Sequence, residues 1–159
     1  MINNQNNNEF NGIWFFGLSG SGKTTSSIYL KRNIYKSALL IDGDDVRKFI
    51  SYDLGYNIED RKIQISRILG LCKLCVKSKI FPICSTVYMD KYFINEINKI
   101  KIKIIKIERN FQDLKNLKIY QLKENVIGID KHYEDKLKVK IIKNKIKEDL
   151  YENLLKEFG

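Results

Sequence analysis

A run of glycines, serines and one lysine near the N-terminus has the spacing of a phosphate-binding loop. The stretch from Gly17 to Thr24, GLSGSGKT, fits the pattern G-x-x-x-x-G-K-[ST] at every position. An apolar run at 13–17 leads into it and a helix-forming run at 23–35 follows, which is the setting this motif requires. The loop is therefore predicted to hold the phosphates of ATP.

Each residue type in this loop suits the task of holding phosphate. Glycine permits backbone angles that a side chain would block, so backbone N–H groups and the N-terminus of the next helix can face the anion. Lysine can bridge the β- and γ-phosphates, and threonine can bind Mg²⁺. We expect Lys23 to be catalytic and Thr24 to be a Mg²⁺ ligand. The residues expected to bind ATP are Gly17, Ser19, Gly20, Ser21, Gly22, Lys23, Thr24 and Thr25.

A second group of reactive side chains, DGDDVR, follows the apolar run at 38–41. Its carboxylates stand where a parallel strand would end, at the edge of an α/β sheet where ligands bind. A carboxylate there can take a proton from an acceptor hydroxyl or organise Mg²⁺-bound water. The same residues also suit an ordinary acidic turn that caps a helix. Beside a phosphate loop the functional interpretation is favoured, with Asp42 holding the metal through water and Asp44 near the acceptor.

Three arginines follow on predicted helices. Arg47, Arg61 and Arg67 are candidates for clamping acceptor phosphates, because a guanidinium group can pair with two such oxygens at once. A solvated helix face is the alternative interpretation. The cysteines at 72, 75 and 84 are too few for a disulfide framework, and we expect them to be buried reduced thiols.

Length and composition indicate one soluble domain. The chain has 159 residues, of which 43% are hydrophobic, and no apolar run is long enough to span a membrane. Its polar start lacks a secretion signal, so the cytoplasm is expected, with residues 1–10 as a disordered tail. The net charge of +10 would suit an anionic partner, but the lysines are spread along the chain without a nucleic-acid-binding motif. Neither nucleic acid nor a membrane is expected as a partner.

Strands that alternate with helices predict an α/β fold. Buried parallel strands read as continuous apolar runs, and IWFF, ALLI and KIIKI have this character. The pattern predicts a three-layer, P-loop kinase-like sandwich with a five-stranded parallel sheet, as a single domain over 11–159. A short, polar, irregular lid is expected at about 110–135. The strands are expected at 13–17, 38–41, 80–84, 102–107 and 139–142.

The order of several sequence blocks resembles the adenylylsulfate (APS) kinase family. The family's GLSGxGK[ST]T, DGDNxR and DLGF stand here as GLSGSGKTT, DGDDVR and DLGY. Its DR…N…R, CS and FTGID.PYE blocks stand as EDRKIQISR, ICS and VIGIDKHYE, so the resemblance covers most of the chain. It implies a kinase that uses ATP and Mg²⁺ to phosphorylate the ribose 3′-hydroxyl of a small acidic nucleotide. Members of the family tend to pair, so a homodimer is implied as well.

The resemblance also implies roles for individual residues. Asp44 would be the catalytic base, and Arg47 and Arg61 would hold the acidic group of the acceptor. The residues expected around the acceptor are Asp42, Asp44, Arg47, Tyr56, Arg61, Gln64, Ser85, Thr86, Val87, Tyr88, Lys123, Val126 and Ile127.

Departures from the family pattern concern the base pocket. Val126 stands where the family has a phenylalanine that stacks on adenine, Gln64 replaces an asparagine and Tyr88 replaces a serine. Losing one stacked ring costs ~1–3 kcal/mol, whereas the phosphate-facing residues are kept. A smaller pyrimidine base is therefore favoured, as in the APS-kinase-like cytidine diphosphoramidate kinases of capsule biosynthesis. The alternatives are an APS kinase, a kinase of another small molecule such as a sugar or nucleoside, and a non-catalytic nucleotide-binding regulatory module.

Overall fold

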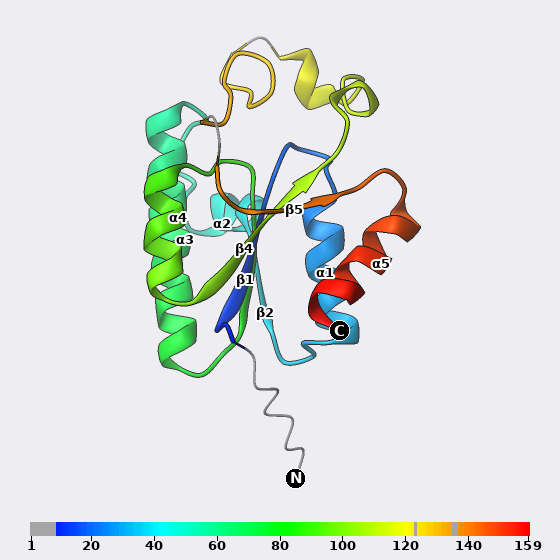
Figure 1. Cartoon of the computed structure of the whole chain (residues 1–159). Coiled ribbons are helices and arrows are strands. Elements are labelled where there is room, and N and C mark those ends of the chain that lie inside the picture. Colours follow the sequence, from blue (N-terminus) through cyan, green and yellow to red (C-terminus); the bar gives the residue numbers. More distant parts are fainter. Residues whose placement is uncertain (1–8, 123, 135–136) are drawn as a thin grey trace.

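Five parallel strands form one sheet in the order β2-β3-β1-β4-β5 (Figure 1). The structure, a computed structural model, describes residues 9–122, 124–134 and 137–159. The predicted α/β fold with a five-stranded parallel sheet is confirmed. The strands are β1 (Gly12–Phe16), β2 (Leu39–Asp42), β3 (Pro82–Thr86), β4 (Ile102–Glu108) and β5 (Lys140–Lys143).

Helices cover both faces of this sheet, which gives three layers. Alternate residues of β1 point to opposite faces. Ile13 and Phe15 belong to the cluster that contains Leu30 of α1 and Leu154 of α5, whereas Trp14 packs with residues of α3 and α4. The helices are α1 (Lys23–Asn33), α2 (Gly43–Phe49), α3 (Ile58–Lys77), α4 (Lys91–Lys99) and α5 (Lys147–Phe158).

Side chains cap the starts of three helices. Asn57 caps α3, and its side chain accepts a hydrogen bond from the backbone N–H of Asp60. Asp42 and Asp90 cap α2 and α4 in the same way. Pro82 begins β3, where the missing N–H of proline is tolerated.

The lid between β4 and β5 contains two short 3₁₀ helices, Phe111–Asp113 and Lys118–Gln121. Figure 1 shows these turns beyond the carboxyl ends of the strands. They lie against the phosphate loop, because the Tyr120 hydroxyl donates to the backbone oxygen of Ser19 (2.7 Å). A side chain at Gly20 would also meet Leu117 at 2.5 Å. The lid therefore rests directly on the loop.

The N-terminal part of the chain is described from Glu9 onward. Most of the expected tail, residues 1–8, lies outside the described residues, but Phe10 packs against Phe81 and Phe158 at ring distances of 6.1 and 6.0 Å. Phe10, one of the residues expected in the tail, therefore packs against the domain. All three cysteines are buried free thiols. Among the helices of the described residues, none has the length and apolar character needed to cross a membrane.

A buried hydrogen bond between β1 and β3 yields a stability prediction. The Trp14 indole donates to the Thr86 hydroxyl (2.8 Å), which in turn donates to the Tyr88 backbone oxygen (3.2 Å). Thr86→Val keeps the shape but leaves the indole N–H unpaired, so the free energy of unfolding should fall by roughly 1–3 kcal/mol in urea titrations. Thr25→Val, at an exposed helical position, is the control and should change little. Equal unfolding midpoints for the two variants would contradict this assignment.

Candidate active site

The phosphate loop joins the end of β1 to the start of α1 and is held from the β4 side. Gly17 has a φ of 151°, and a Cβ there would come within 2.3 Å of the Ile107 backbone oxygen on β4. Gly22 caps α1 in the left-handed region, with a φ of 108°, beside the Asn144 side chain. Glycine is required at both positions because a side chain would be strained and would collide. The predicted strand–loop–helix setting of the motif is confirmed.

Lys23 is buried in the first turn of α1. Its side chain is only 8% exposed, and its Nζ donates to the backbone oxygen of Leu18 (2.9 Å). Burial lowers the pKa of Lys23 from the usual 10.5 to about 8, although the negative charges of Asp44 and Asp42 act in the opposite direction. An ammonium group held in this way gains a strong partner when an anion enters the loop.

A hydrogen bond connects the phosphate loop with the acidic segment after β2. The Thr24 hydroxyl donates to Asp42 Oδ2 (2.8 Å), and Asp42 Oδ1 accepts from the backbone N–H of Asp44 (2.9 Å). One carboxylate therefore caps α2 and fixes the threonine at the same time. Asp44 and Asp45 follow in the first turn of α2 and are both exposed.

The oxygen atoms of Thr24 and Asp42 suit Mg²⁺. This ion prefers oxygen ligands and is bound in kinases through one or two carboxylates together with substrate phosphates and water. Among the described residues, no group of three or more His, Cys, Asp and Glu side chains could hold a metal ion alone. The residues present therefore fit a Mg²⁺ ion that arrives with a nucleotide phosphate.

Arg47 of α2 and Arg61 of α3 both lie over the Tyr56 ring. The guanidinium carbons of Arg47 and Arg61 lie 4.5 and 5.6 Å from the ring centre. Burial, and secondarily the positive charge of Arg47, lower the pKa of Arg61. Tyr56 as a residue is 54% exposed. Two closely spaced cations beside a half-exposed tyrosine suit an acidic nucleotide.

These arginines also shape the surrounding loops. Arg47 donates to the backbone oxygen of Gly55 (2.6 Å). Arg61 donates through Nε to the backbone oxygen of Tyr56 (2.8 Å) and through Nη2 to the backbone oxygen of Asn125 in the lid (2.7 Å). Arg67 instead forms a two-pronged pair with Asp53 (2.5 and 2.7 Å), so its charge is already matched by a carboxylate.

Several expected acceptor residues of β3 and its following turn have partners inside the protein. The Ser85 hydroxyl lies 2.7 Å from that of Ser27, which connects β3 with α1. The Tyr88 hydroxyl donates to Asp90 (2.8 Å), and burial followed by this bond raises the pKa of Tyr88. The Val87 backbone oxygen accepts from the Tyr133 hydroxyl (2.7 Å). In the described structure these hydroxyls stabilise the sheet edge and the lid.

Val126 and Ile127 lie at the base of the lid and are buried. Val126 is 4% exposed and packs with Leu114 and Tyr120, while Ile127 joins the main core. Asp130 closes this turn by accepting from the backbone N–H groups of Asn125 (2.8 Å) and Val126 (2.7 Å). Lys123, the remaining expected acceptor residue, falls outside the described residues.

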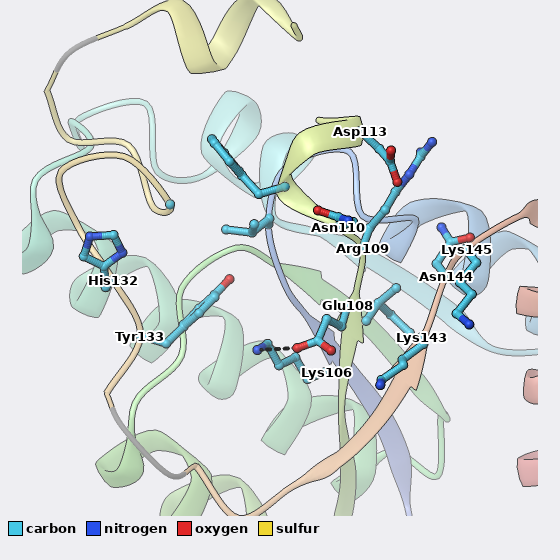
Figure 2. Close-up of a pocket in the computed structure, with 14 residues that line it drawn as sticks. Lys106, Glu108, Arg109, Asn110, Asp113, His132, Tyr133, Lys143, Asn144 and Lys145 are labelled. Carbon is cyan, nitrogen blue, oxygen red and sulfur yellow. Dashed lines mark hydrogen bonds and ion pairs between the residues drawn. The ribbon is translucent and has the colours of Figure 1, made fainter. Parts of the chain in front are cut away.

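Sequence reasoning missed a cavity of about 620 Å³ on the β4–β5 side of the phosphate loop. Figure 2 shows Arg109, Asn144 and Lys145 along one side of it and His132 and Tyr133 along the other. The Asn144 side chain donates to the Ser21 backbone oxygen (2.7 Å) and so supports the loop. Asn144 directly follows the last strand, so the rule that drew attention to Asp42, a polar residue at a strand's carboxyl end, would have identified it.

The lowered pKa of Lys23 predicts how stability depends on pH. The folded pKa of about 8 lies below the unfolded value, so the unfolded chain holds more protons between pH 8 and 10.5, and stability should rise with pH across that window. Lys23→Met removes the buried charge. In urea titrations it should be more stable than the parent near pH 7, by up to about 3 kcal/mol, and should lose this rise. Lys73→Met, at an exposed site on α3, is the control and should keep the rise. Parallel pH profiles for the parent and Lys23→Met would contradict the assignment.

Curated proteins similar to this chain are named adenylyl-sulfate kinases. Among curated relatives, the adenylyl-sulfate kinase of Phocaeicola vulgatus is 39% identical over 99 residues, covering 60% of this chain and 47% of the relative. A chloroplastic adenylyl-sulfate kinase of Catharanthus roseus is 32% identical over 146 residues, covering 82% of this chain and 46% of the relative. The chain thus spans about half the length of the curated relatives it matches.

Solved structures share the fold. The APS kinase CysC of Mycobacterium tuberculosis, in complex with AMPPNP and APS, aligns with a TM-score of 0.80 at 20% identity, covering 93% of this chain and 95% of that chain. At this identity the likeness supports the fold alone. The family model described as adenylylsulphate kinase matches residues 10–142, most of the chain. By this match the chain belongs to the adenylylsulphate kinase family.

Proposed function

We propose that the chain is a kinase that uses ATP and Mg²⁺ to phosphorylate the ribose 3′-hydroxyl of an acidic nucleotide. The observation that carries this proposal is the hydrogen bond between Thr24 and Asp42. It brings the loop suited to the ATP phosphates next to the carboxylates suited to the acceptor hydroxyl. Family membership supports the same reaction class.

The two nucleotides are proposed to lie on opposite sides of the phosphate loop. The cavity beside Arg109 and Asn144 adjoins the loop on the β4–β5 side and has room for the nucleoside part of ATP. The Tyr56 ring with Arg47 and Arg61 lies near α2, beyond the β2 end. A donor and an acceptor placed in this way would meet over Lys23 and Asp44, where the phosphoryl group is transferred.

Three side chains would carry the chemistry. Asp44 is exposed at the start of α2 and can accept the proton of the 3′-hydroxyl as that oxygen attacks the γ-phosphate. The Lys23 ammonium would stabilise the negative charge on the phosphoryl oxygens during transfer. Thr24, with Asp42 behind it, would hold Mg²⁺, which neutralises phosphate charge when bound.

Replacing the proposed base should separate chemistry from ATP binding. Asp44→Asn cannot take up the proton at neutral pH, so the turnover rate should fall roughly 10²-fold or more while affinity for an ATP analogue is retained. Asp45→Asn removes the neighbouring exposed carboxylate and should keep most of the rate. An unchanged rate for Asp44→Asn would exclude Asp44 as the base. ATP binding without transfer to any nucleotide acceptor would instead indicate a non-catalytic regulatory module.

For the acceptor we propose cytidine diphosphoramidate, with adenylylsulfate as the second candidate. Tyr56 offers one aromatic face, and Arg61 bonds both to the Tyr56 backbone and to Asn125, which precedes Val126. Val126 on that side of the lid is 4% exposed and packs inward with Leu114, so the lid offers no second ring there. A site with a single aromatic ring suits a small base such as cytosine. A larger base such as adenine would be held better between two rings. The names of the curated relatives favour adenylylsulfate.

The contribution of the single ring can be measured directly. Tyr56→Leu should raise the acceptor KM about tenfold through lost stacking. Tyr52→Leu, at an 81% exposed tyrosine in the same loop, should leave the KM near the parent value. Steady-state kinetics with both acceptors give these values. Strong turnover of adenylylsulfate together with none of cytidine diphosphoramidate would overturn the acceptor assignment.

A further inference from the structure

Gln64 on α3 has one buried oxygen whose hydrogen bond is missing. The side chain is 4% exposed, and its Nε2 donates to the Gly43 backbone oxygen (2.9 Å). No described residue donates to its Oε1 atom, which is also buried. A buried acceptor without a donor is rare in folded proteins, because it loses its bond to water without a replacement.

The orientation of this amide is determined by its bonded end. If the amide were turned over, Oε1 would face the Gly43 oxygen, and two acceptors would lie against each other. The bond to Gly43 therefore keeps the nitrogen on the α2 side and leaves the oxygen as the group that needs a partner.

Gln64 is connected to both parts of the proposed acceptor site, through a hydrogen bond on one side and through its helix on the other. Gly43, its bonded partner, directly precedes Asp44 at the start of α2. Arg61 is one helical turn earlier on α3, and residues three apart share a helix face. The Gln64 amide is thus bonded to the residue before the proposed base, and its side chain leaves the same helix face as the arginine suited to the acidic end of the acceptor.

A free carbonyl oxygen in this place favours one kind of terminal group. The oxygens of a terminal sulfate carry no hydrogen at neutral pH, so Oε1 would repel them and stay unpaired. A terminal phosphoramidate carries a P–NH₂ group, which can donate to Oε1 while its oxygens accept from arginine. We propose that Gln64 selects nucleotide acceptors whose terminal group carries an N–H donor. This inference rests on the kinase activity proposed above.

Four probes separate the terminal group from the base. They are the adenosine and cytidine nucleotides that end in phosphosulfate or in diphosphoramidate. With the unchanged protein, kcat/KM should favour the amide end over the sulfate end about tenfold or more for either base, since one hydrogen bond is gained and one unpaired oxygen is removed. A preference for sulfate on both bases would overturn the proposal.

The variants test whether Gln64 is the cause. Gln64→Leu and Gln64→Met remove the oxygen at similar volume, and the amide-over-sulfate ratio should fall below about threefold. Gln112→Leu, at an exposed glutamine, is the control and should keep the parent ratio. A ratio that stays at the parent value in either folded Gln64 variant would overturn the proposal. If both variants fail to fold, the ratios of the unchanged protein decide. Absence of transfer to all four probes by the folded chain would instead refute the kinase activity itself.

Discussion

The carboxylate of Asp42 is the group on which the rest of the site depends. One of its oxygens accepts from Thr24 and the other from the Asp44 backbone, so a single side chain connects the start of α1 with the start of α2. The parallel sheet makes this possible, because β1 and β2 end at the same edge and lie on either side of β3. The two bonds of Asp42 thus fix the helix starts relative to each other.

The buried cation of Lys23 and the half-buried cation of Arg61 are destabilised by the loss of water, and a bound anion would reduce this cost. Burial lowers the pKa of Lys23 and of Arg61, which means that the folded chain holds these cations less easily than water does. Asp44 and Asp42 compensate in part for Lys23, whereas Tyr133, Tyr56 and Asp130 do so for Arg61. An entering phosphate supplies the missing negative charge, so part of the affinity of this site for nucleotides comes from cations that are already in place and already partly dehydrated.

The sequence predicted the elements of the fold well, because their signals are local. Apolar runs marked the strands, and the run at 23–35 marked α1. The contacts between elements could not be predicted in this way. The bond from Asn144 to Ser21 joins residues 123 positions apart, and the Ser27–Ser85 contact joins residues 58 positions apart. Such pairs depend on the order of the strands in the sheet, and no short stretch of the sequence carries a signal for that order.

Arg61 affects both the position of the lid and the charge available to bind an acceptor. Arg61 uses Nε and Nη2 to hold the Tyr56 and Asn125 backbones, and a guanidinium group has further N–H donors beyond these two. Tyr120 bonds to Ser19 in the phosphate loop, and Tyr133 bonds to Val87 after β3. The lid is therefore bonded to the phosphate loop and to the loops around the arginines. Any change in Arg61 would alter both the position of the lid and the charge offered to an acceptor. Variants at other residues, which leave the guanidinium group in place, are needed to separate the two effects.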